Sequence, residues 1–140
     1  MAAALRRVEA AVGIDVFVVV LFVAIGRRNH DESPGIGGLV ETAAPFLIGL
    51  AVGWLAARVW TAPIGWRTGL IVWVLTVAVG MLCRRLFFDE GTAMSFVIVA
   101  SVFLGVFLNG WRAVVRRLVR PDQSATTTRS DAERPNTSGA

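Results

Sequence analysis

Lysine and tyrosine are absent from this 140-residue sequence, and cysteine and histidine each occur once. With Cys83 as the single cysteine, the chain can form no internal disulfide, no CxxC redox motif and no cluster of thiolate ligands. With His30 as the single histidine, the usual histidine-rich metal sites and paired haem sites are excluded as well. We therefore expect no enzymatic activity, no metal and no cofactor, since neither a nucleophile–base pair nor a ligand cluster is visible.

Charged residues are also scarce, at 17% of the chain, whereas 55% of the residues are hydrophobic. The apolar residues form four long runs, at 8–26, 38–57, 69–83 and 93–111, which short charged clusters separate. A helix needs about 20 mostly apolar residues to cross a bilayer. The sequence therefore predicts an all-α, integral membrane four-helix bundle over residues 1–120. We expect the first run to be retained as a span rather than cleaved as a signal peptide, because Asp15 interrupts it.

The fourteen basic residues are all arginines, and most of them lie at the ends of the apolar runs. Although the formal net charge is +4, arginines at such positions mark membrane boundaries rather than a nucleic-acid-binding face. Trp60, Trp66 and Trp111 also occur at span ends, where indole rings favour the headgroup region. We therefore expect the lipid bilayer as a partner and no nucleic acid.

The distribution of arginines predicts the orientation of the chain in the membrane. Four spans place the N-terminus, the second loop and the C-terminus on one side, which holds ten arginines against four on the other. Cytoplasmic segments carry the excess of basic residues. Both termini are therefore expected in the cytoplasm and the protein in the cell (inner or plasma) membrane. Residues 121–140 are polar and predict a disordered cytoplasmic tail.

The two halves of the chain share a weak internal repeat. Arg27-Arg28 followed by Asp31-Glu32 resembles Arg84-Arg85 followed by Asp89-Glu90, and similar apolar segments follow each set. Such repeats are frequent in transporters, but apolar helices also resemble one another by chance. A bundle of two similar helical hairpins and a bundle without duplication are both compatible with the sequence.

Asp15 is an acidic residue inside the first span, eight residues after Arg7, which is about 12 Å deeper at 1.5 Å per residue. A carboxylate at that depth is costly, so we expect it to face the bundle interior near a hydrogen-bond donor. Thr76 and Ser101 lie near the middle of later spans, and we expect one polar layer with Asp15. That layer is either a proton or cation site or a set of structural hydrogen bonds. A shifted first helix would instead place the acid nearer the interface.

A second candidate site lies at the outer face of the membrane. Its members are residues that follow the first and third spans or begin the second, namely Arg27, Arg28, His30, Glu41, Arg84 and Arg85. If the two hairpins pack side by side, several guanidinium groups converge near one carboxylate and can bind an oxyanion. The alternative is that each arginine reaches water separately and pairs with a neighbouring acid. The site requires Glu41 to lie within ion-pair distance of at least one arginine.

The second span also contains Gly49 and Gly53, a GxxxG pair that lets another helix approach closely. The partner helix belongs either to the same chain or to a second copy, and the pair alone does not distinguish the two. Pro45, four residues after Glu41, removes one helical hydrogen bond and predicts a mild kink.

An ordered set of short motifs resembles one known family. These motifs are Phe22 to Gly26 followed by Arg27-Arg28-Asn29-His30, Pro45-Phe46, Gly53-Trp54, Gly80-Met81 with Arg84, Thr92-Ala93 with Ser95-Phe96, and Gly110-Trp111-Arg112. Over roughly residues 14–112 they are similar to the bacterial and archaeal membrane family called domain of unknown function 3054. That family often has a small hydroxyl residue where this chain has Asn29. The resemblance implies a four-helix membrane domain and no particular activity.

Two classes of function fit the sequence. One is a small transporter or channel-like protein that uses Asp15 as its intramembrane polar site. The alternative is a non-catalytic membrane subunit or scaffold that binds another membrane protein or a second copy of itself. The small size, the sparse intramembrane charge and the small-residue packing favour the second class, whereas Asp15, Glu41 and the repeat favour the first.

Overall fold

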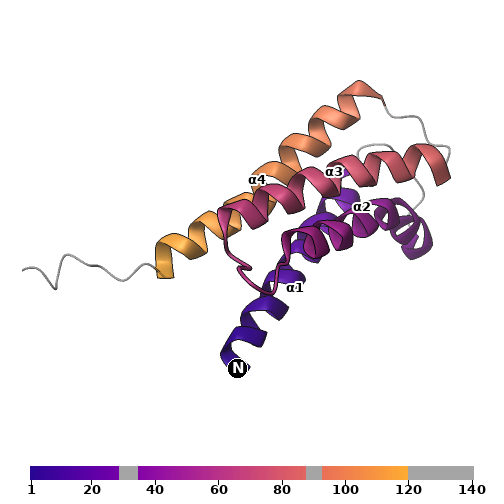
Figure 1. Ribbon diagram of the computed structural model, residues 1–140. Coiled ribbons are helices and arrows are strands. Elements are labelled where there is room, and N and C mark those ends of the chain that lie inside the picture. Colours follow the sequence, from indigo (N-terminus) through magenta and orange to yellow (C-terminus); the bar gives the residue numbers. More distant parts are fainter. Residues whose placement is uncertain (29–34, 88–92, 120–140) are drawn as a thin grey trace, which may run out of the picture.

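The computed structural model describes residues 1–28, 35–87 and 93–119, which form four α-helices. These are α1 (Ala2–Arg28), α2 (Ile36–Ala57), α3 (Trp66–Phe87) and α4 (Met94–Val119), shown in Figure 1. All four are long and apolar enough to cross a membrane, and the described ranges contain no strand. The prediction of an all-α bundle with four membrane spans is confirmed, whereas the predicted tail at 121–140 lies outside the described residues.

The four helices form a closed ring in which each contacts both of its neighbours. α1 packs against α2 and α4, and α3 packs against the same two helices from the other side. The interior is filled by aliphatic and aromatic side chains from the helices around it. Phe22 is at its centre, with ring centroids 5.6 Å from Phe46, 5.9 Å from Phe96 and 5.4 Å from Phe103.

The closest approach in the bundle joins α2 to α3. A Cβ atom on Gly49 would lie 2.7 Å from the carbonyl oxygen of Thr76, and one on Gly53 would lie 3.0 Å from the Cα atom of Val72. Only glycine lets the two backbones come this near. The GxxxG pair therefore contacts a helix of the same chain, which answers the question that the sequence left open.

A short, tightly bonded loop joins α2 to α3. α2 is capped by Arg58, which has the left-handed backbone conformation (φ 49°, ψ 55°) usually taken by glycine at a helix end. The N–H groups of Arg58 and Val59 donate to the carbonyls of Leu55 and Trp54. At the other end of the loop, the Thr68 hydroxyl donates to the carbonyl of Ala62 over 2.8 Å. These bonds hold the intervening residue Pro63 beside the bundle, where its carbonyl takes part in the site described below.

Candidate functional site

Asp15 and Arg112 form an ion pair in which both side chains are 0% exposed. The Nη1 atom of Arg112 lies 2.8 Å from Oδ1 of Asp15, and Nη2 lies 2.6 Å from Oδ2. This is the two-pronged arrangement in which a planar guanidinium matches a carboxylate best. The pair joins the middle of α1 to the last third of α4.

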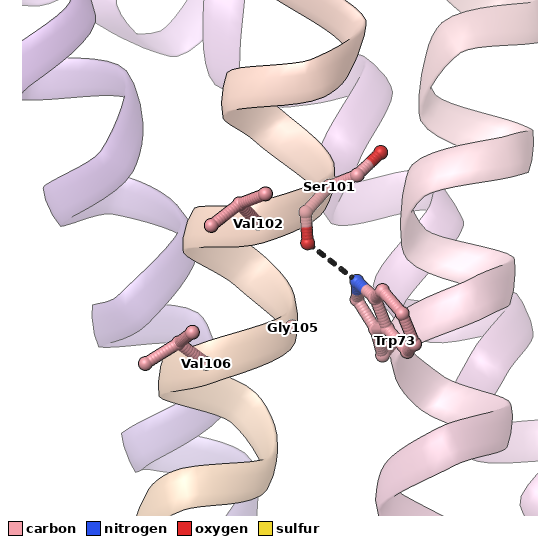
Figure 2. A pocket seen from close by; sticks show the side chains of 5 residues that line it. All are labelled: Trp73, Ser101, Val102, Gly105 and Val106. Atoms are coloured by element: carbon pink, nitrogen blue, oxygen red, sulfur yellow. Dashed lines mark hydrogen bonds between the residues drawn. The ribbon is translucent and has the colours of Figure 1, made fainter.

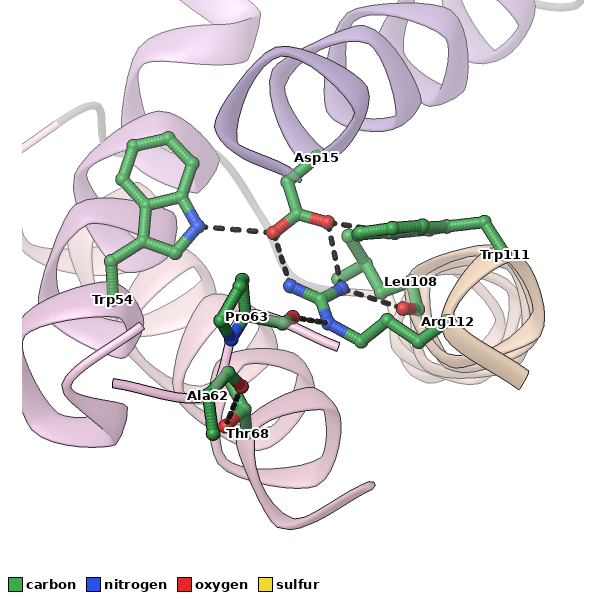
Figure 3. A network of polar contacts seen from close by, with 8 residues as sticks. All are labelled: Asp15, Trp54, Ala62, Pro63, Thr68, Leu108, Trp111 and Arg112. Carbon is green, nitrogen blue, oxygen red and sulfur yellow. Dashed lines mark hydrogen bonds and ion pairs between the residues drawn. The ribbon is translucent and has the colours of Figure 1, made fainter. Parts of the chain in front are cut away.

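Two indole groups complete the surroundings of the carboxylate, as Figure 3 shows. Trp54 of α2 donates its Nε1–H to Oδ2 over 3.1 Å, and Trp111 of α4 donates to Oδ1 over 3.0 Å. Each oxygen of Asp15 therefore accepts two hydrogen bonds, which matches the four lone-pair positions of an ionised carboxylate. No acceptor position of this buried acid is left for a proton or a cation.

Arg112 is also held by groups that do not belong to α1. Its Nε donates to the carbonyl of Pro63 over 3.1 Å, and its Nη1 donates to the carbonyl of Leu108 over 2.7 Å. The guanidinium carbon lies 4.6 Å from the centroid of the Trp111 ring. Space for this long side chain comes from Gly69 of α3, where a Cβ atom would lie 3.1 Å from Cδ of Arg112.

The sequence did not identify the partners of Asp15. Arg112 is one of the ten arginines on the expected cytoplasmic side and Trp111 is one of the span-end tryptophans, whereas in the structure both bind the buried carboxylate. A usable signal was present, because a buried acid needs a cation and Arg112 directly follows an apolar run. Without Arg112, the expected cytoplasmic side still has nine arginines and the other side has four, so the predicted orientation is unchanged.

The predicted polar layer of Asp15, Thr76 and Ser101 is wrong, although Asp15 does face the interior. Its partner Arg112 is eleven residues beyond Ser101 in α4, or about 16 Å along the helix axis. Asp15 therefore lies beside the α2–α3 loop, near one end of the bundle. Thr76 is buried against α2, and its hydroxyl has no hydrogen-bond partner.

The error has a simple physical cause in α1. Asp15 of α1 bonds to Trp54 of α2, and Arg27, twelve residues later, bonds to Thr42, twelve residues earlier. These two contacts fix the antiparallel register of α1 and α2. In that register residues 2–11 extend beyond the end of α2, and most of them are exposed. Figure 1 shows this end of α1 projecting from the bundle. Arg7 therefore lies beyond the end of α2, and the distance from Arg7 to Asp15 does not give the depth of Asp15 within the bundle.

Among the described residues, Glu41 and the arginines of the predicted outer cluster do not meet in one ion-pair site. Arg27 donates through Nη1 to the carbonyl of Gly38 and the hydroxyl of Thr42, both over 3.0 Å. Arg84 is buried with its guanidinium carbon 4.7 Å from the centroid of the Phe96 ring. Glu41 is exposed and forms no ion pair with any described arginine.

The remaining members of the predicted outer cluster are two arginines and the single histidine. Arg28 and Arg85 are exposed, and His30 lies outside the described residues. Glu41 lies within ion-pair distance of no arginine in the described part of the chain, so the requirement set for a shared anion site is not met there. Among residues 1–28, 35–87 and 93–119, no group of three histidine, cysteine, aspartate or glutamate side chains could hold a metal ion.

A shallow apolar groove lies on the outside of the bundle between α3 and α4. Trp73, Ser101, Val102, Gly105 and Val106 line it, and its volume is about 290 Å³. Figure 2 shows the indole of Trp73 beside Gly105, with its Nε1–H donating to the backbone carbonyl of Ser101 over 2.9 Å. Gly105 makes room for that ring, because a Cβ atom there would lie 2.8 Å from it.

Comparison with known families identifies one match. A family described as protein of unknown function (DUF3054) matches residues 12–115, which is more than half of the chain. The chain belongs to this family. The match includes Asp15, Trp54, Trp111 and Arg112, so the whole ion-pair site lies within the DUF3054 region. Comparisons with curated proteins and with solved structures gave no match.

Proposed function

We propose that this DUF3054 protein is a non-catalytic membrane subunit or scaffold that binds another membrane protein. The observation that carries the proposal is the saturation of Asp15, whose two carboxylate oxygens accept four hydrogen bonds at full burial. A carrier of protons or cations needs an acid that exchanges partners during its cycle. Asp15 instead joins α1, α2 and α4 in one arrangement.

The bundle interior also favours a structural role over transport through a single copy. Between the ion pair and the opposite end of the bundle, most of the described buried side chains are apolar, and the buried polar exceptions are Thr76 and Arg84. Ion pathways through membrane proteins are lined by polar groups or water. The two grooves described on this protein are apolar and lie on its outer surface.

The face of α4 is the best candidate for a partner. Only 17% of the residues in its most apolar stretch are buried in the bundle, the lowest share of the four helices. The groove beside Gly105 lies on this helix, between α4 and Trp73 of α3. A partner helix in this groove would pack against Val102, Val106 and the indole of Trp73, which fills the space over Gly105.

We propose that the protein resides in the cell membrane with both termini in the cytoplasm, because the arginine excess lies on that side. Reporter fusions after residues 35 and 90 are expected to report the outside, and a fusion after residue 63 the cytoplasm. Residue 63 is informative because Pro63 contacts Arg112 at the end of the bundle that carries both termini. An external signal from that fusion contradicts the topology.

The scaffold role is tested by pairing a flux measurement with site-specific crosslinking. Purified protein in liposomes is expected to give proton, sodium and potassium fluxes equal to those of protein-free liposomes. In the membrane of its own cells, a photoreactive amino acid at Val102 or Val106 is expected to give one discrete adduct. The same group at Phe17, which is 64% exposed on α1, serves as the matched control. Ion flux that Asp15→Asn abolishes, together with no adduct, would overturn the proposal.

A further inference from the structure

The surroundings of Asp15 have the form of a binding site with an internal ligand. α1 contributes only the carboxylate, whereas all four hydrogen-bond donors come from α2 and α4. Those donors are the indole N–H groups of Trp54 and Trp111 and two guanidinium nitrogens of Arg112. They converge on two oxygen atoms of one planar anion.

The guanidinium group of Arg112 is held by groups outside α1. Nε of Arg112 is fixed by the carbonyl of Pro63, and Nη1 is fixed by the carbonyl of Leu108. The guanidinium also lies against the ring of Trp111. A binding site that is held before its ligand arrives loses little ordering entropy on binding.

From this geometry we infer that Trp54, Trp111 and Arg112 form a binding site for small monocarboxylates, which Asp15 occupies in the folded chain. When the Asp15 side chain is removed, the buried cation of Arg112 has no counter-charge, and a free carboxylate of matching size replaces it. Formate matches the carboxylate group that Asp15→Ala deletes. Chloride carries the same charge but presents one acceptor atom instead of two, so it does not match the two-pronged geometry of the guanidinium as a carboxylate does.

The test uses NMR spectra of the full-length Asp15→Ala variant in detergent, with its tryptophans labelled with ¹⁵N. The five indole N–H signals are assigned by single Trp→Phe substitutions. The signals of Trp54 and Trp111 are expected to move when the carboxylate is deleted. Formate is expected to return them toward their wild-type positions in a saturable manner, with half-saturation no tighter than about 1 mM for a ligand of three heavy atoms. The signal of Trp73, which donates to Ser101, serves as the internal control and is expected not to respond.

Two further arms keep the inference falsifiable. With Asp15→Ala, chloride at equal ionic strength and neutral formamide are expected to give no saturable response. With the double variant Asp15→Ala/Arg112→Gln, formate is also expected to give no saturable response. If Asp15→Ala does not fold in chloride, purification in formate is expected to raise the yield of monodisperse protein, while chloride does not. Equal responses to formate and chloride, in signals or in yield, overturn the inference. The inference does not depend on the scaffold role, because the flux and crosslinking results can fail while this site binds formate.

Discussion

Replacing Arg112 by glutamine is expected to destabilise the folded protein by about 3–5 kcal/mol, the usual effect of removing one partner of a buried ion pair. The Asp15 carboxylate would remain buried at 0% exposure with only the two indole donors. The change also removes bonds to the carbonyls of Pro63 and Leu108, so the contact between α4 and the α2–α3 loop weakens. Reversible unfolding in mixed detergent micelles, followed by tryptophan fluorescence, measures the loss.

Arg117→Gln is the matched control for this change. Arg117 lies five residues later on the same helix but is exposed, and it has no ion pair among the described residues. Its free energy of unfolding is expected to change by less than about 0.5 kcal/mol. Equal effects of the two substitutions would mean that Arg112 acts as another boundary arginine.

Gly49→Ala is expected to destabilise the bundle by about 1–3 kcal/mol, because it overfills a well-packed contact. The new Cβ atom would lie 2.7 Å from the carbonyl oxygen of Thr76 and 3.0 Å from the backbone nitrogen of Gly80. Both atoms belong to the α3 backbone, so relief requires the two helices to separate. The free energy of unfolding in the same detergent mixture measures the effect.

Gly110→Ala provides the control for the glycine substitution. A Cβ atom at Gly110 would meet nothing within 4 Å, and the residue lies inside α4. Alanine is expected to stabilise the helix there by up to about 1 kcal/mol, since it restricts the unfolded chain more than glycine does. A Gly49→Ala protein as stable as Gly110→Ala would contradict the close α2–α3 contact.

The sequence predicted the fold well because membrane spans are recognised from the hydrophobicity of consecutive residues. Long apolar runs, span-end arginines and turn residues each report a local preference, and the four predicted spans fall inside α1 to α4 apart from Ala93, which directly precedes α4. The GxxxG pair likewise marked the place of a close helix contact. Its partner helix could not be known, because the pair only permits a close approach and does not specify what approaches.

The site was predicted in part, since Asp15 was recognised as a buried acid that needs a donor. Its partners escaped prediction because they depend on how far each helix extends past its neighbours. The expected depth of Asp15 is counted from Arg7, but α1 continues beyond α2, so the acid lies near Pro63 rather than at the middle of the bundle. Offsets of this kind arise from three-dimensional packing and leave no mark in local hydropathy.

A double-mutant cycle on Asp15 and Arg112 tests the central claim most directly. The free energies of unfolding of the wild type, Asp15→Asn, Arg112→Gln and the double variant are measured in one detergent mixture. For two charges in direct contact and fully buried, a favourable coupling energy of at least about 1.5 kcal/mol is expected, and the double variant should be far less destabilised than the sum of the two single changes. Additive effects with no coupling would contradict the account, because they would mean that Asp15 and Arg112 do not hold the bundle together as a pair.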